Sequence, residues 1–139
     1  TWWVDPHNSD PAYRRVRIRS EALPVLEDVL GGGVAEALAR TADQVRADGA
    51  HLDALADAVN DPLAVSTLEA LAPVLRSRVL RRTALAAGAD PSALSAAHLA
   101  ELDRLVTDWH GQLRIELPGG VACVRVGDSL AFVTTPVGG

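Results

Sequence analysis

This chain has little cysteine, no lysine and no long apolar run. Cys123 is the single cysteine among 139 residues, which excludes an internal disulfide and a metal site built from several thiolates. We expect Cys123 to pack in a strand as a small hydrophobic residue. The four histidines, His7, His51, His98 and His110, are too far apart for the usual spacing of metal ligands, so no metal site is expected.

Membrane and targeting segments are also missing from the sequence. No stretch approaches the roughly 18 apolar residues that a membrane helix needs, and the N-terminus has no recognisable signal peptide. We therefore expect a cytoplasmic protein without a membrane partner. The chain opens on Thr1 rather than methionine, and we expect it to be part of a longer protein.

A phosphate-binding loop cannot be found either. The glycines at 31–33 lack the lysine and the preceding strand that a P-loop requires. We expect this chain alone to bind neither ATP nor a metal ion, and to contain no catalytic residue.

The charge of the chain is acidic overall but unevenly spread. Its thirteen basic residues, all arginines, face eighteen Asp and Glu, for a formal net charge of -5. This balance argues weakly against a dedicated nucleic-acid binder, because such binding depends on neutralising phosphates. The positions of the arginines matter more for this question than the net charge. Eight arginines lie in two clusters, within residues 14–19 and 76–82.

Hydrophobic periodicity predicts a mainly α chain. Pro11 suits the first turn of a helix. Pro24 is expected to end or kink that helix, because its ring clashes with the carbonyl of Ser20. Ser66 with Glu69 predicts a capping box at the start of a later helix.

The longest predicted helix runs from Val34 to Val59. Apolar residues recur in it every seven positions, and small residues lie between them. Such a narrow seam allows close packing against another helix, so this helix could join two domains or two subunits, and a homodimer stays open. The seam consists of Leu38, Val45, Leu52 and Val59 with the small residues Ala42, Gly49 and Ala56.

The period changes from 3.6 to 2 near the C-terminus. A helix is expected from Ser95, and after Gly111 short alternating segments are separated by the glycine turns at 118–120 and 127–128. The predicted fold class is therefore mainly α, a helical bundle with one long seam helix and a small C-terminal antiparallel β meander (α+β).

The first arginine cluster poses a problem of burial. If residues 11–23 are helical, Arg15 and Arg19 share the apolar arc that should face the core. Unpaired buried charges cost several kcal/mol, so both need acceptors. One interpretation pairs them with the nearby Asp5 and Asp10, which would staple a loop to its own helix. The other presents them to an anionic ligand or an adjoining domain.

The second cluster also has two interpretations. Arg78, Arg81 and Arg82 share one arc of a predicted helix, with Arg76 opposite. The arc is either a solvated helix face or a site of phosphate contact, because the planar guanidinium fork suits phosphate oxygens.

A family resemblance joins these observations. Residues 5–24 resemble the end of the catalytic domain, and the linker after it, in tRNA(Ile)-lysidine synthetases, bacterial enzymes of the ATP pyrophosphatase class. Residues 98–132 look similar to the region of that family that follows the linker. Val16 departs from the pattern, because the family usually has Asn there. The matching positions are Asp5, Asn8, Asp10, Tyr13, Arg15, Arg19 and Leu23-Pro24.

The resemblance implies a function for a longer protein. The full-length enzyme would use ATP and Mg to adenylate the wobble cytidine of an AUA-reading tRNA and then join lysine to it. Its ATP-binding PP-loop would lie in an N-terminal catalytic domain upstream of this chain. By resemblance, residues 1–32 would be the end of that domain and a linker helix, and residues 33–139 a tRNA-binding domain.

The expected site residues follow from the resemblance at residues 5–24 and from the shared arc of the second arginine cluster. Asp5, Asn8, Asp10, Tyr13, Arg15 and Arg19 are expected at a substrate or domain interface, and Arg78, Arg81 and Arg82 at the tRNA. The alternative is a helical dimerisation or ligand-binding module of a regulator, in which the seam helix is the working part.

Overall fold

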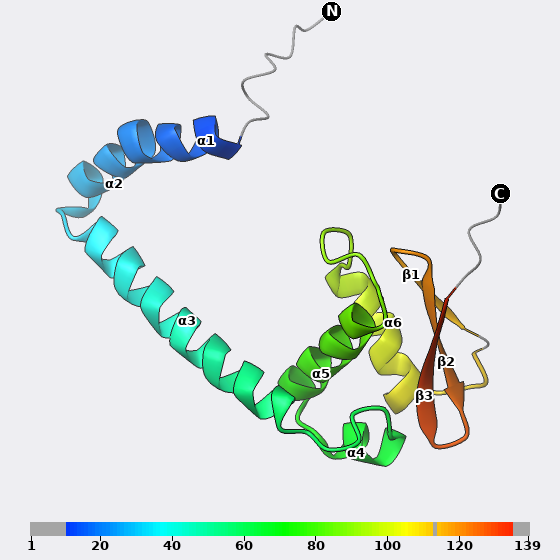
Figure 1. Cartoon of the computed structure of the whole chain (residues 1–139). Helices are drawn as coiled ribbons and strands as arrows, with labels where there is room; N and C mark the ends of the chain where they lie inside the picture. Colours follow the sequence, from blue (N-terminus) through cyan, green and yellow to red (C-terminus); the bar gives the residue numbers. More distant parts are fainter. Residues whose placement is uncertain (1–10, 113, 135–139) are drawn as a thin grey trace, which may run out of the picture. The chain divides into compact units, whose positions relative to one another are not determined.

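The computed structural model describes residues 11–112 and 114–134, which form helices followed by a three-stranded sheet (Figure 1). They fall into two compact units, 1–48 and 49–139, and the long helix α3 belongs to both. The predicted mainly α class with a C-terminal β meander is confirmed. The elements are α1 (Pro11–Arg17), the π-helix η2 (Ile18–Ala22), α2 (Leu23–Leu30), α3 (Val34–Asp57), α4 (Val65–Ala70), α5 (Pro73–Ala86), α6 (Ala96–Thr107), β1 (Ile115–Leu117), β2 (Val121–Val126) and β3 (Ser129–Thr134).

The first helical run does not end at Pro24. It passes through the π turn η2, in which the N–H of Leu23 donates to the carbonyl of Ile18, and continues as α2 to Leu30. A proline lacks the N–H of a regular turn, and its ring would meet the carbonyl of Ser20. The wider π turn just before Pro24 accommodates both demands. Of the two predicted outcomes, an end of the helix is wrong, and the run is instead locally distorted at this position.

A carboxylate fixes the corner between α2 and α3. The Glu27 side chain accepts hydrogen bonds from the N–H groups of Ala35 at 2.8 Å and Val34 at 3.2 Å, the first residues of α3. These bonds lower the pKa of Glu27 from its ordinary value. Gly31 ends α2 with a left-handed φ of 78°.

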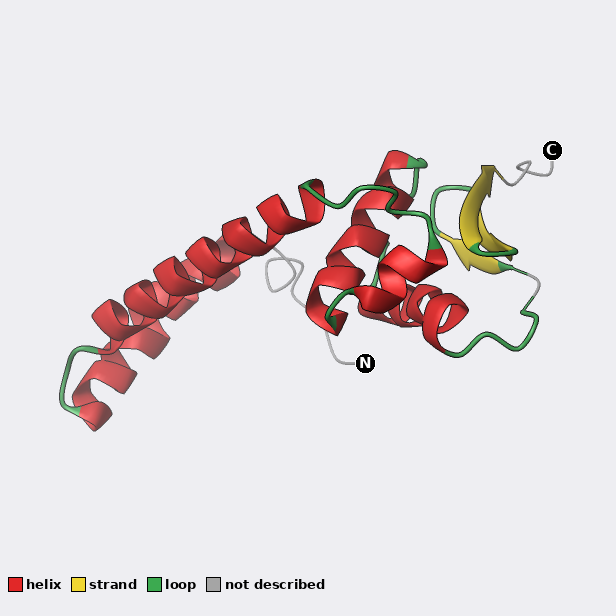
Figure 2. Ribbon diagram, turned by 90° about the horizontal axis from the view of Figure 1, so that it is seen from below, coloured by secondary structure: helices red, strands yellow, loops and turns green. Residues whose placement is uncertain are grey.

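The core lies in the second unit. Helix α6 packs against α5 and also against β1 and β2, so it lies between α5 and the sheet. Figure 2 shows the helices of this unit gathered beside the sheet. Side chains from α4, α5, α6 and the strands fill the space between these elements. The largest fully buried ones are Leu68, Leu80, Leu102, Leu105, Leu130, Val79 and Cys123.

The sheet is the predicted antiparallel meander, in the order β1-β2-β3. Cys123 occupies its centre, opposite Ile115 on one side and Phe132 on the other. It is fully buried, as predicted, and burial raises the pKa of its thiol to about 12.

The β1–β2 turn touches the loop after α5. The N–H of Asp90 donates to the carbonyl of Pro118 at 2.9 Å. Gly119 has a φ of +94°, and a Cβ on it would lie 2.7 Å from the carbonyl oxygen of Gly88 and 2.8 Å from the nitrogen of Asp90. Only glycine fits this position without a shift of the backbone.

Helix α4 begins differently from the prediction. Its N-cap is Ala64 and no side chain caps it, so the capping box at Ser66 is wrong. The N–H of Val65 instead donates to the carbonyl of Asp128 at 2.8 Å, in the β2–β3 turn. The expected start at Ser95 is confirmed, because its hydroxyl and the His98 ring form a reciprocal cap for α6.

The seam of α3 is covered only near its C-terminal end. Ala56 is 6% exposed and belongs to the core, whereas Leu38 and Val45 are 55% and 64% exposed. Gly49 and Ala42 are half-buried. A Cβ on Gly49 would lie 4.0 Å from the guanidinium of Arg78, with ordinary van der Waals space around it.

Candidate nucleic-acid interface

The second arginine cluster lies on α5, which begins at Pro73 in the position where a missing N–H costs nothing. Arg76 differs from the other three because it is only 8% exposed. Its Nε donates to the Asp103 carboxylate at 2.5 Å and its Nη1 to the carbonyl of Leu71 at 3.1 Å. Arg76 therefore joins α5 to α6 and is a structural residue.

Two other arginines pair with carboxylates from the last turns of α3. Arg78 lies 2.6 Å from Asp53, and Arg82 forms an ion pair with Asp57. All four residues belong to the second unit. Both arginine side chains stay partly exposed, by 32% for Arg78 and 46% for Arg82. Neither interpretation from the sequence included these carboxylates.

The third member of the cluster is held by a loop. Arg81 is half-buried and its Nη1 donates to the carbonyl of Leu94 at 3.3 Å, just before α6. Arg82 and Asp57 also line a shallow cavity of about 250 Å³ between the end of α3 and α5. The surface thus presents three guanidinium groups against two carboxylates, so its charge is weakly positive although the chain is acidic.

The first cluster lies on an exposed helix. Arg15 and Arg19 are exposed, and so are Val16 at 59% and Ile18 at 54% on the apolar arc that was expected to face a core. The two arginines are therefore not buried within the described chain, which corrects that expectation. Asp5, Asn8 and Asp10 lie outside the described residues, so their pairing stays a prediction.

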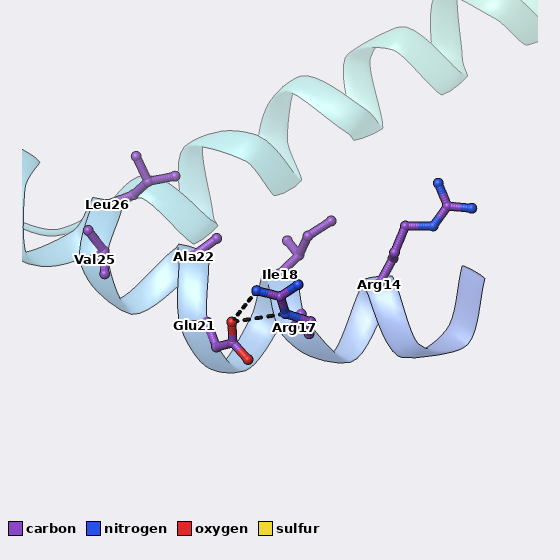
Figure 3. Close-up of a pocket in the computed structure, with 7 residues that line it drawn as sticks. All are labelled: Arg14, Arg17, Ile18, Glu21, Ala22, Val25 and Leu26. Atoms are coloured by element: carbon purple, nitrogen blue, oxygen red, sulfur yellow. Dashed lines mark hydrogen bonds and ion pairs between the residues drawn. The ribbon is translucent and has the colours of Figure 1, made fainter. Parts of the chain in front are cut away.

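A groove of about 640 Å³ lies along the same helical run (Figure 3); Ile18 and Leu26 of the arc line it, but Arg15 and Arg19 do not. Ile18, Ala22 and Leu26 project from the same side of the helical run, together with Arg14. Arg17 and Glu21 form an ion pair of 2.9 Å at its edge. Tyr13, also predicted at this interface, is 44% exposed.

Sequence reasoning missed a contact between β2 and the end of α6. Arg125 places its guanidinium over the ring of Trp109, 4.8 Å from the ring centroid. The same side chain donates to the carbonyl of Leu105 at 2.9 Å and to that of Gly127 at 3.1 Å. No local pattern could reveal this contact, since the two residues come together only when the sheet packs on α6.

Two kinds of site are absent from the residues that the structure describes. Within 11–112 and 114–134, no group of three His, Cys, Asp or Glu side chains could hold a metal ion. None of the helices in the same ranges is long and apolar enough to cross a membrane.

The chain is similar to known proteins over most of its length. Residues 63–130 match the model of the TilS substrate binding domain. The chain is 54% identical over 124 residues to a tRNA(Ile)-lysidine synthase of Thermobifida fusca, an alignment that covers 84% of this chain and 38% of that protein. The chain is a relative of the tRNA(Ile)-lysidine synthases. A second such synthase, from Streptomyces coelicolor, is 52% identical over 138 residues, covering 94% of this chain and 39% of the relative.

The resemblance to tRNA(Ile)-lysidine synthetases predicted from residues 5–24 and 98–132 is thus confirmed. The chain spans about two fifths of the length of these curated lysidine synthases. The domain match at 63–130 contains the α5 arginines as well as Trp109 and Arg125. The comparisons do not favour the alternative of a regulator module.

Proposed function

We propose that this chain is the tRNA-holding part of a longer ATP-dependent ligase that joins lysine to the wobble cytidine of an AUA-reading tRNA. The match of residues 63–130 to a substrate binding domain of that family carries the proposal. By the resemblance, ATP and Mg would bind in an N-terminal catalytic domain of the same cytoplasmic enzyme. This chain alone would hold substrate without turnover.

We assign the tRNA contact to Arg78, Arg81 and Arg82. A guanidinium carries five N–H donors, and the contacts described for Arg78 and Arg82 each involve a single nitrogen. Further donors therefore remain for phosphate oxygens. The carboxylates of Asp53 and Asp57 each contact one of these guanidiniums and would compete with phosphate for it.

The first cluster has a different role in this proposal. Arg15 and Arg19, with Tyr13 and the preceding Asp5, Asn8 and Asp10, would face the catalytic domain or its reacting groups. The exposed apolar arc beside the two arginines supports this assignment, because a surface of this kind usually contacts another protein surface.

The test is tRNA affinity at several salt concentrations in the full-length enzyme. The double variant Arg78→Gln/Arg82→Gln should weaken binding and flatten the log–log salt slope by up to about one unit for each phosphate that is no longer neutralised. Binding of ATP should stay intact, because the ATP site is expected in the N-terminal catalytic domain.

The matched control is Arg40→Gln/Arg46→Gln on the part of α3 before Gly49, which removes the same charge outside the matched domain. It should leave the slope nearly unchanged. Equal slopes for the wild type and the α5 variant would remove this cluster from the tRNA surface. Absence of tRNA binding by the wild-type enzyme would overturn the proposed function as a whole.

A further inference from the structure

Trp109 is an unusual residue to leave in solvent. The chain has only five aromatic residues, and this one is 45% exposed in the segment that follows α6. An indole has a large apolar surface, which normally packs against other side chains. The exposed part of the ring is therefore available to a ligand.

Arg125 fixes the indole rather than merely touching it. The guanidinium lies over the ring, 4.8 Å from its centroid. Hydrogen bonds to the carbonyls of Leu105 at 2.9 Å and Gly127 at 3.1 Å hold the guanidinium itself. One face of the ring is thus covered by a planar cation that is anchored to α6 and to the β2–β3 turn.

The backbone beside Trp109 is also well bonded. The carbonyl of Asp108 lies 2.8 Å from the Nδ1 of His110 and accepts from the Nε2 of Gln112 at 3.0 Å. The Gln112 side chain accepts the N–H of His110 at 2.7 Å. Arg104 places its Nε 4.0 Å from the Asp108 carboxylate, which offsets the acidic charge next to the indole.

We propose that Trp109, held by Arg125, is a stacking platform for an unpaired base of the bound tRNA. The proposal rests on the proposed function, since it names a second contact made by the same tRNA. Proteins recognise single-stranded RNA by stacking its bases on aromatic rings and guanidinium planes. The ring of Trp109 is exposed and is fixed beside an arginine, and it lies within the match to the substrate binding domain at 63–130. These features suit stacking on a base.

Stacking and phosphate contact leave different signatures in binding data. Stacking releases few counterions, so its removal lowers affinity with little change in the salt slope, whereas removal of an arginine that binds phosphate flattens the slope. Trp109→Ala in the full-length enzyme should therefore bind tRNA about 5- to 150-fold more weakly with an unchanged slope. Trp109→Phe, which keeps a ring, should recover most of the affinity.

Chemical probing of the bound tRNA supplies the second measurement. One unpaired base protected by the wild-type enzyme should become reactive with Trp109→Ala and stay protected with Trp109→Phe. A melting temperature close to the wild-type value would show that the variant is folded.

Wild-type affinity and protection in Trp109→Ala would overturn the stacking platform, and the proposed function would survive if the α5 variants still flatten the slope. A large loss of melting temperature together with loss of ATP binding would instead mean that Trp109 packs on the catalytic domain, which also overturns the inference. Failure of the wild-type enzyme to bind tRNA would remove the proposed function itself.

Discussion

Arg78 lies 2.6 Å from Asp53 and links the middle of α5 to the last turns of α3. Arg82 and Asp57 repeat this arrangement one turn further along both helices. The Asp side chains are 53% and 56% exposed, so each pair contributes only about 0–1 kcal/mol to stability. The carboxylates would also repel a phosphate that approaches the same guanidiniums.

A first prediction follows from this competition. Asp53→Asn/Asp57→Asn should bind tRNA more tightly than the wild type at low salt, because two negative charges leave the proposed phosphate surface. The salt slope should stay equal or become steeper. Affinity measurements at three or more salt concentrations provide the check, with thermal melting to confirm that stability changes little.

The control for charge alone is Asp43→Asn/Asp48→Asn, which neutralises two exposed carboxylates on the part of α3 before Gly49. An equal gain in affinity from both variants would mean that only the overall charge matters. Weaker binding by the Asp53/Asp57 variant would show that the carboxylates position the arginines more than they compete with phosphate.

The second prediction concerns pH and the α2–α3 corner. Hydrogen bonds from Ala35 and Val34 lower the pKa of Glu27 below its ordinary value of 4.5. A lowered folded-state pKa gives stability that is fully present above the unfolded-state value and is lost as pH falls through the folded-state value. The start of α3 should therefore fray as pH drops below about 4.5.

Amide hydrogen exchange at Val34 and Ala35 measures this fraying directly. In Glu27→Gln the two amides should exchange faster at neutral pH, and the difference from the wild type should shrink in acid. Asp28→Asn, which removes the neighbouring carboxylate, should not reproduce the effect. Wild-type protection that is independent of pH between 3 and 7 would rule out Glu27 as the cap.

The sequence predicted the meander well because its signals are local. Alternation after Gly111 and two glycine turns are enough to define β1 to β3. The cap at Ser95 was local as well. The capping box predicted at Ser66 was wrong because the N–H of Val65 is bonded to the carbonyl of Asp128 in the β2–β3 turn. A partner so distant along the chain cannot be predicted from a short stretch of sequence.

The candidate site was harder to predict for a related reason. Periodicity placed Arg78, Arg81 and Arg82 on one arc and separated Arg76, whose burial agrees with that split. It could not show that Asp53 lies opposite Arg78, because that contact depends on how α3 meets α5. Periodicity likewise identified the apolar arc on which Arg15 lies. Periodicity shows which residues share a helix face, but it does not show whether another part of the protein covers that face.

The third prediction is a severe steric effect at the β1–β2 turn. Gly119→Ala would place a Cβ 2.7 Å from the carbonyl oxygen of Gly88, in a backbone conformation with φ at +94°. Strain and backbone overlap together should lower the free energy of unfolding by about 2–4 kcal/mol.

Gly127→Ala is the matched control, because its φ is +60° and no atom lies within 4 Å of the added Cβ. It should cost only about 1 kcal/mol, from the left-handed backbone alone. Denaturant unfolding of the two variants measures the difference. An equal loss of unfolding free energy in the two variants would mean that the β1–β2 turn can move away from Gly88.

The last prediction concerns Gly49 in the middle of α3. A Cβ there would lie 4.0 Å from the flexible end of Arg78, so the described chain has room for a methyl group. Helical glycine costs roughly 0.5–1 kcal/mol relative to alanine, so Gly49→Ala should raise the free energy of unfolding by about that amount. If a second copy or another domain covers the seam with a close-packed helix, the same change would instead overpack that contact and destabilise the protein by about 1–3 kcal/mol. Thermal melting together with sedimentation at several concentrations separates these cases, because overpacking of a dimer seam would also shift the protein towards monomer.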